Sequence, residues 1–204
     1  MIPKVIYILH ESMKEIFSLD EKWRILHPDY TIHIVNTDNY KSILKSINPV
    51  YLEIFNAIQS PKVKTDFMRL ILLYEKGGFI MDSNLEPLYN LDPLCNNSLI
   101  LCKSMVEFSD SPYCTKCLAG QSNQPYIKTL IYYYINNFFN GKNFLKNWEL
   151  EKIMKNCLPS KFISNNKIGT IQQQSAHFFY DAAYIYKKMR ILNDKTTYFR
   201  DSGK

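Results

Sequence analysis

The stretch that decides the fold is residues 64–94, KTDFMRLILLYEKGGFIMDSNLEPLYNLDPL. Apolar residues recur at helical spacing through its first half, which predicts a helix that ends at Gly77-Gly78. The apolar residues 79–81 then predict a short buried strand that ends at Asp82. A carboxylate at the carboxyl end of a strand lies where open α/β sheets bind ligands.

Strands and helices alternate on both sides of this stretch. The predicted strands are residues 4–9, 30–35, 79–81, 99–102 and 168–171, with a short strand or turn near 178–180. The predicted helices are residues 13–26, 39–47, 49–58, 61–76, 125–139 and 146–157, and loops are predicted at 86–97 and 109–113. Such alternation, without a repeat or a linker, predicts a single α/β domain over residues 1–204. The chain stops without a helix cap or tail, which is also what a domain excised from a longer chain would show.

The composition excludes several classes of protein. The 204 residues are 46% hydrophobic and 14% aromatic, which argues against disorder. The formal charge of +6 comes from scattered Lys and Arg residues rather than from a dense basic run. We therefore expect no nucleic-acid partner, and the basic balance suits an anionic ligand such as a nucleotide.

The sequence predicts neither secretion nor a transmembrane segment. Residues 1–4 run directly into the first predicted strand, and no apolar run reaches the roughly 18 residues of a spanning helix. Five cysteines, an odd number, fit free thiols in a reducing compartment, so a cytoplasmic location is expected. The CxxC motif at residues 114–117 matches no common zinc module and is assigned no role.

Asp66 and Arg69 place two charges on an otherwise apolar helix. They lie one turn apart and share a face, so a surface ion pair is one interpretation. However, apolar residues enclose Arg69 in the sequence, and a partly buried guanidinium needs carboxylate or phosphate partners. Asp66 and Asp82 are the nearest carboxylates in the sequence. We therefore favour a functional role for this group.

Asp82-Ser83-Asn84 is the candidate metal site. Hard cations such as Mg²⁺ and Mn²⁺ prefer oxygen ligands, and Mg²⁺ takes one or two carboxylates plus substrate phosphates. Side chains at alternate positions beyond a strand can point into one cleft, where they could hold an ion that bridges a diphosphate. Taken alone, the triplet is better explained by an Asx-turn. Its position after Asp66 and Arg69 favours the metal site.

These residues belong to a longer ordered pattern. Its central members are Thr65-Asp66, Arg69, Leu73-Tyr74, Gly77-Gly78-Phe79, Asp82-Ser83-Asn84 and Leu91-Asp92-Pro93-Leu94. Flanking members are Ile2-Pro3-Lys4-Val5-Ile6, Trp23 with His27-Pro28-Asp29-Tyr30, and the segment from Ala119 to Tyr134. The pattern resembles the glycosyltransferases whose sugar-binding region contains a DXD motif, among them capsular-polysaccharide sugar transferases and the initiating mannosyltransferases of yeast outer-chain synthesis. The resemblance covers roughly two-thirds of the chain. The glucosyltransferase domains of large clostridial toxins share its centre.

The resemblance implies a GT-A-like nucleotide-binding α/β sandwich with a central, mostly parallel sheet. It implies a UDP- or GDP-linked sugar donor, Mn²⁺ or Mg²⁺ as cofactor, a glycan or other hydroxyl acceptor, and transfer with retention. The residues implied for the donor are Tyr7, Leu9, His10, Asp66, Arg69, Asp82 and Ser83. Those implied for catalysis are Asp82, Arg69, Gln121 and Asn123, and those for the metal are Asp82, Asn84 and Asp201.

Two departures from the family pattern bear on the metal. Asn84 stands where the family has Asp, which removes one charge, so weaker metal binding is expected. Asp201 lies where the family carries a His- or acid-bearing closing segment, and it is either an extra metal ligand or a solvated tail residue. His33 and His177 are expected to be structural. Two alternatives stay open: a nucleotide-sugar-binding module with little catalysis, and a toxin-like protein glycosyltransferase, for whose docking helices this short chain has little room.

Overall fold

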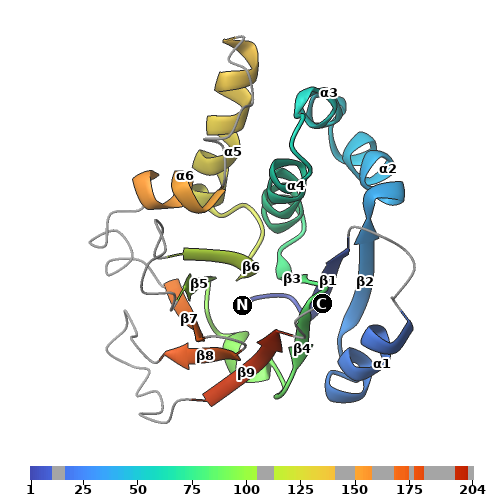
Figure 1. Ribbon diagram of the computed structural model, residues 1–204, viewed down its shortest axis with the longest axis vertical. Coiled ribbons are helices and arrows are strands. Elements are labelled where there is room, and N and C mark those ends of the chain that lie inside the picture. Colours follow the sequence, from blue (N-terminus) through green and yellow to red (C-terminus); the bar gives the residue numbers. More distant parts are fainter. Residues whose placement is uncertain are drawn as a thin grey trace.

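The computed structural model describes residues 1–10, 17–104, 113–140, 150–157, 168–174, 177–181 and 196–201. A twisted sheet runs through these residues, with helices on both of its faces (Figure 1). The elements in chain order are β1 (Val5–His10), α1 (Phe17–Leu26), β2 (Thr31–Asn36), α2 (Thr37–Ile47), α3 (Pro49–Ala57), α4 (Pro61–Glu75), β3 (Gly78–Asp82), β4 (Leu85–Pro87), the 3-10 helix η2 (Asp92–Leu94), β5 (Leu99–Ser104), β6 (Tyr113–Gly120), α5 (Pro125–Phe139), α6 (Leu150–Cys157), β7 (Ile168–Gln174), β8 (His177–Asp181) and β9 (Thr196–Asp201).

The sheet has the strand order β2-β1-β3-β6-β5-β7-β8-β9-β4. Strand β1 is parallel to β2 and β3, and β5 is parallel to β7. Strand β6 is antiparallel to both β3 and β5, so β2, β1, β3, β5 and β7 all run in one direction. Strand β6 opposes them in the middle of the sheet, and β8 and β4 oppose them toward its far edge. The predicted α/β class with a central, mostly parallel sheet is confirmed.

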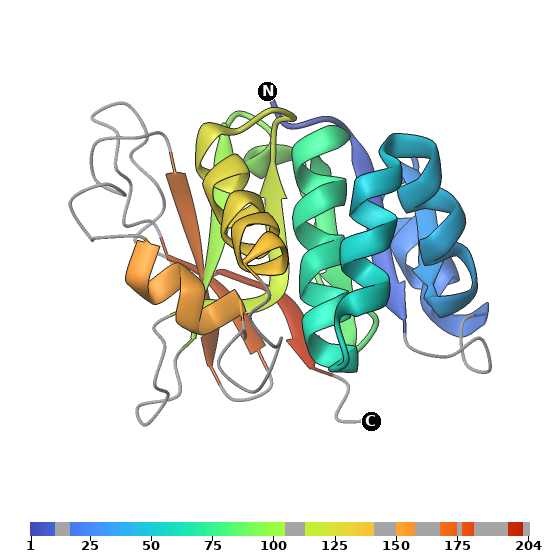
Figure 2. The ribbon, with the colours of Figure 1, turned by 90° about the horizontal axis from the view of Figure 1, so that it is seen from above.

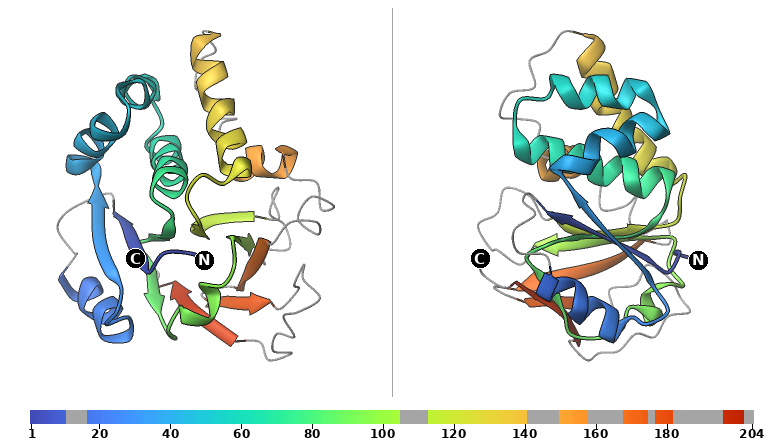
Figure 3. Two further views of the ribbon diagram at one scale, coloured as in Figure 1. Left: turned by 180° about the vertical axis from the view of Figure 1, so that it is seen from behind. Right: turned by 90° about the vertical axis from the view of Figure 1, so that its right-hand side faces the viewer.

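Helices cover the two faces of the sheet unequally. Helices α2, α3, α4 and α5 all lie on one side of the sheet (Figure 2), where α3 lies farther from the strands than α4, while α1 lies on the other side (Figure 3). Along β3 the buried side chains alternate: Ile80 belongs to the core under α4, and Phe79 and Met81 belong to the core on the opposite face. This period of two is that of a strand buried on both faces, and it fixes which face each residue of β3 presents.

Helix α4 and strand β3 meet through two glycines. The helix begins after Ser60, whose side chain accepts the Val63 N–H, and it ends before Gly77 (φ +69°) and Gly78 (φ +101°). A Cβ on Gly78 would lie 2.6 Å from the carbonyl oxygen of Val5 in β1. Only glycine fits this backbone approach, and the turn directs β3 alongside β1 toward Asp82.

Three strands were not predicted from the sequence. Strand β6 occupies residues around the CxxC motif, β4 lies inside the predicted loop 86–97, and β9 lies near the carboxyl end. Strand β4 stands at the edge of the sheet, where Pro87 costs no ladder hydrogen bond. The predicted helices over 13–26 and 146–157 are confirmed from residues 17 and 150 onward, and their first residues lie outside the described ranges.

The pattern residues outside α4 and β3 form a structural cluster at the amino ends of β1 and β2. The buried His27 ring stacks on Trp23, with ring centroids 5.3 Å apart, and burial lowers its pKa. The Tyr30 hydroxyl donates to Asp92 at 2.9 Å, and Lys4 pairs with the same carboxylate at 2.9 Å. These contacts tie the segment before β2 to the η2 turn, so this part of the pattern holds the fold together at the edge remote from Asp82.

Candidate functional site

The parallel strands β1 and β3 end next to each other. Leu9 pairs with Asp82 in the sheet register, and the Ser83 N–H donates to the Leu9 carbonyl at 2.9 Å. The predicted donor-binding residues of β1 therefore share an edge with the Asp82-Ser83-Asn84 corner. Leu9 is buried, whereas Tyr7 and His10 are half-buried. This edge is the ligand-binding edge of open α/β sheets.

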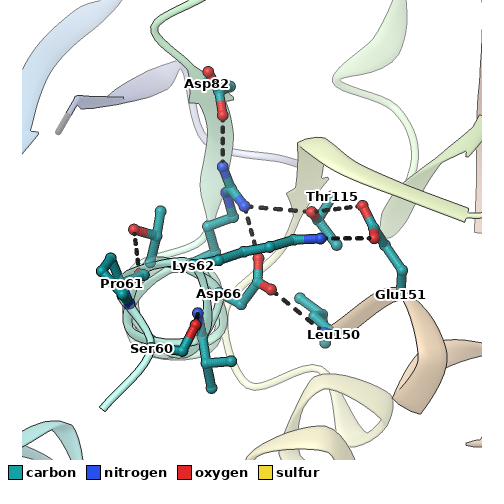
Figure 4. Close-up of polar contacts among 11 residues, drawn as sticks. Ser60, Pro61, Lys62, Asp66, Asp82, Thr115, Leu150 and Glu151 are labelled. Atoms are coloured by element: carbon teal, nitrogen blue, oxygen red, sulfur yellow. Dashed lines mark hydrogen bonds and ion pairs between the residues drawn. The ribbon is translucent and has the colours of Figure 1, made fainter. Parts of the chain in front are cut away.

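Arg69 connects helix α4 to this corner. Its Nη1 donates to Asp66 Oδ1 at 2.7 Å, and its Nη2 donates to Asp82 Oδ2 at 2.8 Å (Figure 4). The Arg69 side chain is 6% exposed, Asp66 is 0% exposed and Asp82 is 21% exposed. The predicted convergence of these three residues is therefore present, and only Asp82 presents accessible surface to a ligand.

Burial and pairing act in opposite directions on these groups. Burial raises the pKa of Asp66, and the nearby Arg69 guanidinium opposes that rise. Burial alone would lower the pKa of Arg69, but Asp66 and Asp82 outweigh it and raise the pKa. Arg69 therefore stays cationic. Two carboxylates around one guanidinium leave the trio with an excess negative charge, which attracts a cation and repels a bare diphosphate.

Asp82 is held by both of its carboxylate oxygens. Oδ2 accepts from Arg69, and Oδ1 accepts the Asn84 N–H at 3.1 Å. The second contact is the Asx-turn that the triplet predicts on its own, and the first is the ion pair that the functional interpretation requires. The two interpretations are compatible, because the turn orients the carboxylate that Arg69 binds.

Asp66 lies beneath helix α6. Its Oδ1 accepts from Arg69, and its Oδ2 accepts the Leu150 N–H at 3.4 Å. The carboxylate has no accessible surface, so its partners in this structure are protein groups. Contact between Asp66 and a sugar or ribose hydroxyl, which the resemblance implies, would require α6 to move.

The backbones of the other two predicted metal ligands, Asn84 and Asp201, lie near Asp82. Asn84 lies two residues beyond Asp82, and the backbone of Asp201 pairs with Leu85 in the β4–β9 ladder. Asn84 therefore belongs to the Asp82 corner, and the backbone of Asp201 in β9 lies beside the strand that follows it. Within the described residues, no group of three or more His, Cys, Asp or Glu side chains forms a metal-binding cluster.

The structure does not bring Gln121 and Asn123 to this corner. They follow β6, which runs antiparallel to β3, so Gly120 pairs with Gly78 at the start of β3. The Asn123 N–H donates to the Tyr74 carbonyl at 2.7 Å, near the end of α4. Asp82 stands at the far end of β3. The catalytic role proposed for Gln121 and Asn123 lacks this proximity, and we leave it out of the site.

Two residues absent from the sequence prediction extend the trio: Thr115 contacts Arg69, and Glu151 contacts Thr115. The Thr115 hydroxyl lies 3.3 Å from Arg69 Nη1 and 3.4 Å from Glu151 Oε1 (Figure 4). Both lie far from α4 in the sequence, and no local pattern distinguishes them. Only the positions of β6 and α6 in the fold reveal the contact.

Comparison with protein families identifies the segment that carries this corner. Residues 14–101 match the model described as "Glycosyltransferase sugar-binding region containing DXD motif". Over these residues the chain is similar to that sugar-binding region. The matched residues include Asp66, Arg69 and the Asp82-Ser83-Asn84 corner, which confirms the resemblance seen in the sequence.

Solved structures share the fold. A structure titled "PaToxG Glycosyltransferase" is 14% identical over 78% of this chain and 70% of its own, with a TM-score of 0.57. Two structures of the glycosyltransferase GlyE from Streptococcus pneumoniae TIGR4 are each 14% identical over 81% and 83% of this chain, with TM-scores of 0.46 and 0.45. The chain spans 48% and 45% of those two proteins.

Two further comparisons bear on the assignment. No curated protein sequence matches this chain. Among the helices that the structure describes, none combines the length and the apolar character needed to cross a bilayer.

Proposed function

We propose that this chain is a glycosyltransferase domain that transfers a sugar from a UDP- or GDP-linked donor to a hydroxyl of a glycan or another acceptor. The transfer depends on Mn²⁺ or Mg²⁺ and retains the configuration at the anomeric carbon. In such a transfer, the bond between the anomeric carbon and the diphosphate oxygen breaks while the acceptor oxygen bonds to the same face of that carbon. The acceptor proton passes to the departing diphosphate. The donor, the metal dependence, the stereochemistry and a cytoplasmic location are all parts of the proposal.

The Arg69–Asp82 ion pair is the observation that carries the proposal. At 2.8 Å, it fixes a partly exposed carboxylate at the ligand-binding edge of the sheet. Arg69 has its charge shared between Asp66 and Asp82, so it orients Asp82 rather than offering an unpaired cation to a phosphate. We therefore assign Arg69 to positioning and Asp82 to ligand contact.

The oxygen donors at this corner fit a hard divalent cation. Asp82 supplies a carboxylate, Asn84 an amide oxygen, and Asp201 is a candidate third ligand from β9. A cation bound there would supply charge neutralisation for the departing nucleoside diphosphate. The excess negative charge of the Asp66–Arg69–Asp82 trio supports metal dependence, because it disfavours a diphosphate that arrives without a cation.

A donor-hydrolysis screen tests the proposal. Purified protein is incubated with UDP- and GDP-sugars in Mn²⁺, in Mg²⁺ and in EDTA, and nucleoside diphosphate release is measured. We expect metal-dependent release from at least one donor, which Asp82→Asn lowers at least about 100-fold. Asp92→Asn is the matched control, since Asp92 is a half-exposed, ion-paired carboxylate at the opposite edge of the sheet.

The same screen distinguishes the first of the two alternatives, a nucleotide-sugar-binding module with little catalysis. Tight binding of a nucleotide sugar without release of its diphosphate, with or without a glycan acceptor, would identify a nucleotide-sugar-binding module. Release that is insensitive to EDTA and to Asp82→Asn would contradict the proposed site. Where a donor is found, NMR of the anomeric proton of the first-formed product determines whether the configuration is retained.

A further inference from the structure

Strand β6 carries a bulge next to Arg69. In the β5–β6 ladder, Leu101 pairs with Leu118, but the following residue, Cys102, pairs with Cys114. Cys114 and Cys117 both lie in the core on the face opposite α4, although residues three apart in a regular strand point to opposite faces. Bulges re-aim side chains and are over-represented next to functional sites. Here the bulge breaks the alternation at residues 115–117.

Thr115 is the residue that the bulge directs to the helix side. Its hydroxyl is buried between Arg69 Nη1, at 3.3 Å, and Glu151 Oε1, at 3.4 Å. A guanidinium can only donate and an ionised carboxylate can only accept. The Thr115 hydroxyl therefore accepts a hydrogen bond from Arg69 and donates one to Glu151. These two hydrogen bonds fix the orientation of the hydroxyl.

The first turn of α6 contacts two of the groups that bind the Arg69 guanidinium. Leu150 donates its N–H to Asp66 Oδ2, and Glu151 accepts from Thr115 (Figure 4). Glu151 also pairs with Lys62, in the first turn of α4, at 3.3 Å. Helix α6 is thus joined to α4 through Asp66 and Lys62, and to β6 through Thr115.

We propose that Thr115 and Glu151 are positioning residues that hold the Nη1 edge of Arg69, so that its Nη2 edge presents Asp82 to the donor and its cation. This inference rests on the proposed function. The guanidinium is planar, so fixing one edge fixes the other. The Arg69 Nε has no hydrogen-bond partner within the described residues, which leaves Asp66, Thr115 and Asp82 to set its orientation. Without Thr115, the Nη1 edge keeps only Asp66.

The test compares Thr115→Val, which removes only the hydroxyl, with Thr115→Ser, which keeps it. The control is Thr129→Val, where an exposed hydroxyl bonds to the carbonyl four residues earlier in α5. The readout is the Mn²⁺ concentration that gives half-maximal donor hydrolysis, with the melting temperature measured in parallel. We expect Thr115→Val to raise that concentration severalfold, which is less than the about 10- to 100-fold cost of losing a direct partner of a metal ligand, because Thr115 acts on Asp82 through Arg69. Thr115→Ser and Thr129→Val should behave as the wild type, and Glu151→Gln should shift in the same direction as Thr115→Val.

Three outcomes overturn the inference. A Thr115→Val protein with a lower melting temperature and an unchanged Mn²⁺ requirement would make the hydroxyl structural only. A Thr115→Ser protein as defective as Thr115→Val would exclude the hydroxyl as the cause. If the wild type hydrolyses no donor, the variants are compared by Mn²⁺-dependent thermal stabilisation with UDP or GDP. Equal stabilisation of wild type and Thr115→Val then overturns the positioning role alone, and no stabilisation of the wild type overturns the proposed function with it.

Discussion

Replacing Arg69 by Met tests the buried ion pair most sharply. The change keeps a long unbranched side chain and removes the guanidinium that binds Asp66 at 2.7 Å. Asp66 is 0% exposed, and of its two partners only the Leu150 N–H would remain. Removing one partner of a buried ion pair costs about 3–5 kcal/mol. Asp66 could instead be protonated in the folded variant. Protonating a carboxyl group whose ordinary pKa is near 3.9 costs about 4 kcal/mol at pH 7.

This reasoning also fixes the sign of the pH dependence. In Arg69→Met the folded state raises the pKa of Asp66 above its unfolded value, so folding takes up a proton. Stability is then gained as the pH falls toward the unfolded pKa and lost as it rises, by about 1.4 kcal/mol per pH unit. We therefore expect the penalty at pH 5 to be smaller than at pH 7 by about 3 kcal/mol. The double variant Asp66→Asn/Arg69→Met should lack this dependence.

Urea unfolding at pH 5 and pH 7 measures both quantities, with thermal unfolding as a second probe. For a chain of this size, the pH 7 penalty corresponds to a fall of about 6–20 °C in melting temperature. Lys22→Met is the control, because the Lys22–Glu86 pair at 3.2 Å is half-exposed on the lysine side and should contribute about 0–1 kcal/mol. An Arg69→Met protein within about 1 kcal/mol of the wild type at pH 7, or equally destabilised at both pH values, would refute the reasoning.

Three further variants probe the fold and the metal site. Gly78→Ala should lower the free energy of unfolding by at least about 1–3 kcal/mol, because the φ of Gly78 is +101° and the added Cβ would meet a backbone oxygen. Gly120→Ala is the control, since the nearest atom there is a movable leucine methyl at 3.0 Å. A larger loss of stability in Gly120→Ala than in Gly78→Ala, measured by chemical denaturation, would contradict the account. Tyr30→Phe should lower stability by about 1 kcal/mol through the lost hydrogen bond to Asp92, and an unchanged melting temperature would show that this bond contributes nothing. Asn84→Asp restores a charge and should lower the Mn²⁺ concentration for half-maximal hydrolysis about tenfold, whereas a higher requirement would exclude residue 84 as a ligand.

The sequence was sufficient where local chemistry and function coincide. Ser60 and Pro61 define the start of α4, Gly77 and Gly78 define its end, and the apolar run into Asp82 defines β3. The convergence of Arg69 with Asp82 was predictable because a charge in an apolar helix needs a partner and the nearest carboxylates are few.

The sequence was insufficient where the answer depends on strand direction. Strand β6 has no period-two pattern because of its bulge, so its residues did not indicate a strand. With β6 unrecognised, its antiparallel direction was also unknown, and the sequence did not show that Gly120, just before Gln121, pairs with Gly78 at the start of β3. The same gap hid Thr115, whose contact with Arg69 exists only because β6 lies beside β3.

The central claim is that the Asp82–Asn84 corner holds a divalent cation for a nucleoside diphosphate. Anomalous diffraction at the manganese absorption edge, from crystals grown with Mn²⁺ and UDP or GDP, tests it most directly. The account predicts an anomalous peak within coordination distance of the Asp82 carboxylate and between it and the nucleotide phosphates. A bound nucleotide with its manganese peak elsewhere, or with none at Asp82, would contradict it.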